Sequence, residues 1–87
     1  MRIVAAYKQF ADYTREVDEW LDQFERRSGS EVERLDPDMP DGEMFCSSRD
    51  ILQYPAIVVV DSEGKTYEMW MGTPLPMVDE VMGYVSF

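Results

Sequence analysis

Two short runs of consecutive apolar residues stand out in the pattern of hydrophobic and polar positions. They occupy residues 3–7 (Ile-Val-Ala-Ala-Tyr) and 55–60 (Pro-Ala-Ile-Val-Val-Val). Unbroken, β-branched runs of this length predict strands buried on both faces of a sheet. Pro55 fixes its own φ and disfavours helical conformation at Tyr54, so any helix before this strand has to end there.

Alternating patterns predict two further strands. Residues 31–36 alternate charged and apolar side chains, as in a short edge strand protected by charge. Residues 61–65 (Asp-Ser-Glu-Gly-Lys) predict a tight hairpin connection, and residues 66–71 predict the returning strand. The alternation places three of its side chains on one face, namely Tyr67, Met69 and Met71, and puts Thr66, Glu68 and Trp70 on the other.

Three segments have apolar residues at helical spacing. The clearest follows a connection at residues 9–12, with Asp12 as the expected cap and Gly29 as the expected end; its stripe is Tyr13, Val17, Trp20, Leu21 and Phe24. A second, weakly amphipathic helix is predicted over residues 42–52 with Asp41 as its cap. A third is predicted from Pro74, capped by Thr73, with the stripe Leu75, Val78, Val81, Met82 and Val85.

The predicted element order is βαβαββα, an α/β arrangement. A right-handed crossover makes the first two strands parallel, and the two apolar runs are expected side by side at the centre, with helices on both faces. The composition is 45% hydrophobic and 30% charged, as in a globular protein, and 87 residues predict one domain spanning residues 1–87.

This order, together with Tyr54-Pro55-Ala56-Ile57 before the valines and Gly72 after the last strand, resembles the thioredoxin-like fold in its minimal, glutaredoxin-sized form. The resemblance covers nearly the whole chain and implies a four-stranded mixed sheet. It also implies a cis peptide bond before Pro55, with Tyr54, Pro55 and Ala56 presenting an open backbone edge to extended partner chains.

The family's Cys-x-x-Cys redox motif is missing from this sequence. At the start of the first helix, Phe10 and Tyr13 have the spacing of the two cysteines. Asp12 beside them would disfavour a thiolate, which the family stabilises with the positive helix N-terminus. The chain also lacks histidine, the usual general base. We therefore expect no oxidoreductase activity of the usual kind and lean against an enzyme.

Cys46, the one cysteine of the chain, is the alternative candidate for chemistry. It would act as a single reactive thiol in a redox protein. The ordinary interpretation is a small apolar residue on a partly buried helix, because free cysteine is among the most buried residue types. The carboxylates of Glu43 and Asp50 would also raise the pKa of this thiol.

The net charge of −10 disfavours nucleic acid and anionic membranes as partners. Most of this charge is expected to keep the protein in solution, although an acidic surface could also block the basic site of a nucleic-acid-binding protein. A calcium site is conceivable at the acidic loop, but the spacing does not fit an EF-hand, and capping and solvation explain the cluster better; it comprises Asp36, Asp38, Asp41 and Glu43. We expect no metal and no cofactor.

Methionine is frequent and suits both irregular cores and adaptable contact surfaces. We assign three to the core and leave three open; the first set is Met69, Met71 and Met82, the second Met39, Met44 and Met77.

The leading hypothesis is a redox-inactive thioredoxin-like module that binds a protein or peptide in a groove beside Pro55. The predicted groove residues are Phe10, Tyr13, Tyr54, Pro55 and Ala56, with Trp70 as a further neighbour. A lone cysteine and the lack of a signal peptide or bilayer-spanning run favour a cytoplasmic location. Homo-oligomerisation is left open.

Overall fold

The two apolar runs form the centre of the sheet in the computed structural model, which describes residues 1–85. β1 (Arg2–Ala6) pairs antiparallel with β3 (Ala56–Val60). β2 (Glu33–Leu35) lies parallel to β1, and β4 (Thr66–Met71) lies antiparallel to β3, which gives the four-stranded order β2-β1-β3-β4. The predicted mixed sheet with two buried central strands is confirmed.

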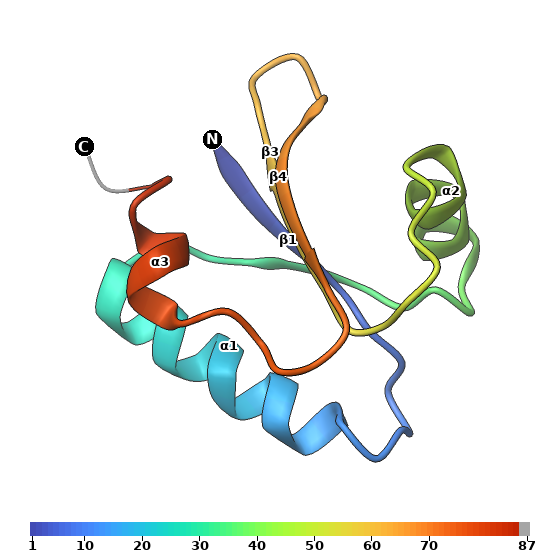
Figure 1. Ribbon diagram of the computed structural model, residues 1–87, viewed down its shortest axis with the longest axis horizontal. Coiled ribbons are helices and arrows are strands. Elements are labelled where there is room, and N and C mark those ends of the chain that lie inside the picture. Colours follow the sequence, from blue (N-terminus) through green and yellow to red (C-terminus); the bar gives the residue numbers. More distant parts are fainter. Residues whose placement is uncertain (86–87) are drawn as a thin grey trace.

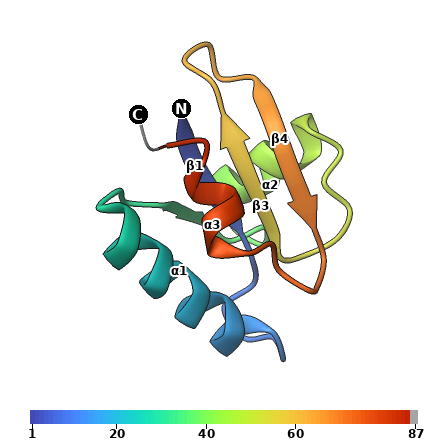
Figure 2. The same ribbon diagram turned by 60° about the vertical axis from the view of Figure 1, so that its left-hand side comes forward.

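Helices cover both faces of this sheet (Figure 1). α1 (Thr14–Ser28) and α3 (Val78–Met82) lie on one face, and α2 (Pro40–Ser48) lies on the other (Figure 2). The strand alternation divides the core accordingly, with Ile57 and Val59 facing α1 and α3, and Val58 and Val60 facing α2. No helix in the described part of the chain is long and apolar enough to cross a bilayer.

α1 buries its predicted stripe, but its beginning differs from the prediction. Its core contacts are made by Val17, Trp20, Leu21 and Phe24, and Gly29 ends the helix at φ 72° with its N–H donated to the carbonyl of Glu25. Asp12 is exposed and does not cap the helix. The chain makes a further turn first, because the Thr14 hydroxyl accepts the Ala11 N–H at 3.0 Å and donates to the Lys8 carbonyl at 2.6 Å.

α2 is shorter than predicted and starts earlier. Pro40 takes the first helical position, so Asp41 lies inside the first turn and caps nothing. The helix ends at Ser48, before Asp50, whose φ of 55° is incompatible with its continuation. Gly42 is buried against the backbone of Asp36, where a Cβ atom would overlap the carbonyl oxygen.

A β-bulge alters the predicted faces of β4. Val59 lies opposite Glu68 but Val60 lies opposite Thr66, so Tyr67 is the extra residue. The Tyr67 ring therefore packs edge-on against Tyr84 at 5.7 Å, and its predicted place on the face of Met69 is wrong. Among the methionines assigned to the core, Met69 and Met82 are partly buried, but Met71 is exposed.

The final helix begins at Val78 rather than Pro74, and Thr73 does not cap it. The Thr73–Pro74 peptide bond is cis, and the chain stays non-helical to Met77. Leu75 still packs against the core beside the buried Val78 and Val81, so the apolar positions were predicted correctly although the helix start was not.

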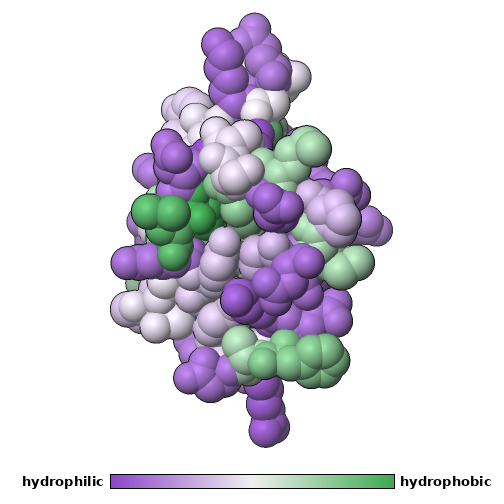
Figure 3. All heavy atoms as spheres, turned by 90° about the vertical axis from the view of Figure 1, so that its right-hand side faces the viewer, coloured by the Kyte–Doolittle hydropathy of each residue, from purple (hydrophilic) through white to green (hydrophobic). Residues whose placement is uncertain are grey.

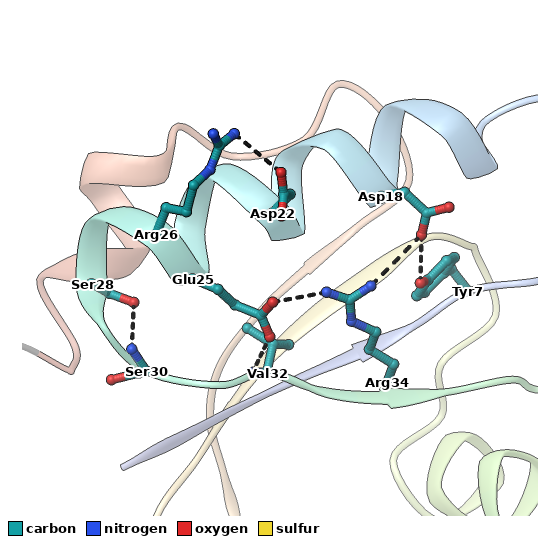
Figure 4. Close-up of polar contacts among 9 residues, drawn as sticks. All are labelled: Tyr7, Asp18, Asp22, Glu25, Arg26, Ser28, Ser30, Val32 and Arg34. Carbon is teal, nitrogen blue, oxygen red and sulfur yellow. Dashed lines mark hydrogen bonds and ion pairs between the residues drawn. The ribbon is translucent and has the colours of Figure 1, made fainter.

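A polar network holds the short edge strand β2 against α1 (Figure 4). Glu25 accepts the Val32 N–H at 2.8 Å and pairs with Arg34 at 2.9 Å. The Tyr7 hydroxyl donates to Asp18 at 2.8 Å, and burial, followed by Asp18, raises the pKa of this phenol. The network gives a three-residue strand tertiary support that its own ladder is too short to supply.

Leucine-to-alanine substitutions at a buried and an exposed position test this core. Leu21 is fully buried, whereas Leu52 is 84% exposed. Leu21→Ala is expected to lower the free energy of unfolding by about 2–5 kcal/mol, because it removes apolar contacts and leaves a cavity. Leu52→Ala should change it by less than about 0.5 kcal/mol. Urea denaturation of both variants measures the difference, and equal effects would contradict the described packing.

Gly42 and Gly83 form a second matched pair. Gly42→Ala is expected to destabilise the protein by about 1–3 kcal/mol or more, because the added methyl group forces α2 away from the Asp36 backbone. At Gly83 the new Cβ would meet its nearest atom, the Glu80 carbonyl oxygen, at an ordinary 3.4 Å. Gly83→Ala should therefore stay within about 0.5 kcal/mol of the parent. Thermal and urea unfolding distinguish the two outcomes.

Candidate functional site

The register of the strands brings three loops together at one end of the sheet. Ala6, the last residue of β1, pairs with Ala56, and Ala56 pairs with Met71, the last residue of β4. The loops at residues 7–13, 49–55 and 72–77 therefore lie close together at this end of the sheet. We call the surface formed by Lys8, Phe10, Tyr13 and Tyr54 the rim; Pro55 lies directly below it.

Phe10 is the most exposed large apolar side chain of the rim, at 98%. Its turn is held by the hydroxyl of Thr14, as described above, and by the Tyr13 phenol, which accepts the Lys8 N–H at 3.0 Å. The Tyr13 ring itself packs against the core. Phe10 is thus a solvent-facing aromatic ring on a fixed turn, and Tyr13 supports that turn.

Tyr54 provides the open backbone of the rim. The Tyr54–Pro55 peptide bond is cis, and the Pro55 carbonyl accepts the Gly72 N–H at 2.8 Å. The side chains of Pro55 and Ala56 are fully buried, so they cannot contact a partner. Within residues 1–85, neither the N–H nor the carbonyl of Tyr54 is hydrogen-bonded. The resemblance implied an open backbone edge at Tyr54, Pro55 and Ala56. In the structure, the backbone groups of Tyr54 are the ones that remain available for pairing.

Lys8 is the rim residue that sequence reasoning missed. Its ammonium nitrogen lies 5.8 Å from the centroid of the Tyr54 ring and 3.8 Å from a carboxylate oxygen of Asp38. No local pattern marks Lys8, because both partners are distant in sequence. Trp70, predicted as a neighbour of the groove, instead packs against Tyr84 at 5.8 Å on the face covered by α3.

Cys46 lies on the inner side of α2 and is only 2% exposed. Burial raises the pKa of its thiol, while a hydrogen bond with the Tyr54 phenol and the charge of Arg49 act in the opposite direction. The sequence interpretation gave Glu43 and Asp50 as the cause of a raised pKa, whereas burial is the cause in the structure. Burial likewise raises the pKa of the Tyr54 phenol, with Cys46 as the next contribution.

The acidic loop is organised by local hydrogen bonds. Asp36 accepts the N–H of Asp38 at 2.8 Å, in the manner of an Asx turn. Among the residues that the structure describes, no three acidic or cysteine side chains are arranged to hold a metal ion.

No family model and no curated protein matches this chain. Two solved structures align with almost its whole length. Thioredoxin 1 from the thermophilic eubacterium Thermosipho africanus TCF52B aligns with a TM-score of 0.69 at 10% identity, over 98% of this chain and 90% of its own. A structure described as that of a malarial protein aligns with a TM-score of 0.68 at 8% identity, over 95% and 90%. These alignments show that the chain has a thioredoxin-like fold.

The environment of Cys46 predicts slow thiol labelling. Alkylation requires the thiolate, and a raised pKa leaves less thiolate at neutral pH. In the native protein, the labelling rate should therefore rise only at a higher pH than in the urea-unfolded chain. Mass spectrometry of iodoacetamide-treated samples from pH 7 to pH 10 measures both profiles, with Cys46→Ser as the blank. Coinciding profiles would show that the thiol is open and unperturbed.

Proposed function

We propose that this chain is a thioredoxin-like module that binds a protein or peptide segment at the rim and carries out no dithiol exchange. The observation that carries the proposal is Phe10, 98% exposed on a hydrogen-bonded turn at the same end of the sheet as the unpaired backbone of Tyr54. Exposed aromatic rings on preorganised backbone are frequent anchors of protein interfaces.

The absence of dithiol exchange is supported by the cysteine count and by the place of Cys46. Exchange of the family's kind needs two thiols, and this chain has one. Phe10 and Tyr13 stand where the resemblance places the pair. Cys46 is buried between α2 and the sheet, and its raised pKa leaves less of the reactive thiolate at neutral pH. These features also weaken the alternative of a single-thiol redox protein.

The proposed binding mode joins one backbone position to one aromatic anchor. The Tyr54 N–H and carbonyl can pair with an extended segment as one strand pairs with another. Two such hydrogen bonds alone contribute little net free energy, because they replace hydrogen bonds to water. The contact with Phe10 therefore has to supply most of the affinity. The Lys8 ammonium group lies over the Tyr54 ring, 5.8 Å from its centroid, and so links the turn of Phe10 to Tyr54.

Phe10→Asp tests the proposal. Peptides are selected from a phage-displayed random library against the immobilised protein, and the enriched sequences are synthesised and titrated by calorimetry. Phe10→Asp is expected to raise Kd at least about tenfold, because it replaces the apolar anchor with a charge.

Met44→Asp is the matched control. Met44 is 71% exposed, but it lies on α2, away from the rim. Its substitution makes the same change in charge and should leave Kd within about twofold. The proposal fails if no sequence is enriched, or if Met44→Asp weakens binding as much as Phe10→Asp does.

A further inference from the structure

A second concave surface lies between α1 and the segment that joins β4 to α3. Two adjoining depressions of about 290 and 310 Å³ share Trp20, Gln23 and Leu75 as lining residues. Figure 1 shows this segment next to α1, and the shared lining residues place the two side by side. The two depressions form one elongated groove, which we call the α1 groove.

The floor of the α1 groove is apolar and fixed. Trp20 is 9% exposed, and its ring stacks on Phe24 at 5.4 Å with an interplanar angle of 5°. Its indole N–H donates to the Pro76 carbonyl at 2.7 Å, which ties the floor to the opposite wall. Leu75 is half-buried in that wall, and Met77 is 73% exposed beside it. A ligand would meet a preformed apolar surface and would not have to order it.

The charges around the α1 groove favour a basic ligand. Glu16 and Glu19 line the end nearest the start of α1. Glu19 is paired with Arg15 at 3.4 Å, whereas Glu16 has no ion-pair partner in residues 1–85. At the other end, Arg27 is paired with Asp79. The basic groups near the groove are therefore each balanced by an acid, and the net charge of −10 adds a long-range attraction for cations.

We propose that the α1 groove binds an extended segment of another protein in which apolar residues alternate with lysine or arginine. Apolar side chains lie over Trp20 and Leu75, and a basic side chain lies at Glu16 and Glu19. A second copy of this chain is disfavoured as the occupant, because two molecules of net charge −10 repel each other. The α1 groove shares no residue with the rim, so this inference goes beyond the function proposed above.

NMR titration of the ¹⁵N-labelled protein with two synthetic peptides tests whether the α1 groove binds a basic segment. One has the sequence acetyl-Lys-Leu-Pro-Lys-Leu-Pro-Lys-amide, and the other has glutamate in place of each lysine. The lysine peptide is expected to shift the signals of the Trp20 indole and of the Leu75 and Met77 amides in a saturable way. The Trp70 indole, packed against Tyr84, is the internal reference and should not move. The glutamate peptide should leave all of these signals unchanged.

Charge reversal tests the place of binding. The double variant Glu16→Lys/Glu19→Lys should bind the lysine peptide about tenfold more weakly, because two attractive contacts become repulsive. It should also gain binding of the glutamate peptide, a gain that a misfolded protein would not show.

Asp41→Lys/Glu43→Lys is the matched control, since it makes the same change in net charge within the first turn of α2 on the other face of the sheet. It should leave Kd within about twofold. Phe10→Asp should also leave it unchanged, which separates this test from that of the rim. The proposal is overturned if the lysine peptide gives no saturable shift at Trp20 up to about 1 mM, or if the α2 control weakens binding equally.

Discussion

The antiparallel pairing of β1 with β3 is the constraint on which both candidate surfaces depend. Because Ala6 lies opposite Ala56, the last residue of β1 and the first residue of β3 lie at the same end of the sheet. The turn of Phe10 and Tyr54 therefore lie at the same end of the sheet, although they are far apart in sequence. The pairing of Ala56 with Met71 adds the segment at residues 72–77, which forms one wall of the α1 groove. A change of register in these strands would separate all three loops.

Much of this fold was predictable because its strongest signals are local. The valine run, the stripe of α1 and the glycine at its end are each explained by burial or by backbone conformation within a few residues. The errors occurred where several residues compete for one role. Asp12 and Thr14 are both residue types that bond to such a turn, and in the structure Thr14 does so, through the Ala11 N–H and the Lys8 carbonyl. The bulge at Tyr67 has no local cause that alternation could reveal.

The candidate site was predictable only in part for the same reason. The resemblance brought Phe10, Tyr13 and Tyr54 together, but it could not show that the side chain of Pro55 is buried or that Lys8 lies against Tyr54. The family resemblance gave no indication of the α1 groove. The stripe of α1 identifies Trp20 as a core residue. The acceptor of its indole N–H, the Pro76 carbonyl, lies 56 positions later in the sequence. Such long-range hydrogen bonds depend on the path of the chain, which side-chain periodicity does not encode.

The two surfaces are physically connected, and this connection affects how a partner would use them. Pro55, below the rim, accepts the N–H of Gly72, and the chain from Gly72 continues directly into the wall of the α1 groove. In the proposed binding mode, the rim contributes backbone pairing and one aromatic ring, contacts that would select weakly for sequence. The groove adds an apolar floor and acidic carboxylates, which in our proposal favour basic segments. For a partner long enough to reach both, the first contact raises the effective concentration of the second, so two weak contacts produce a much tighter complex.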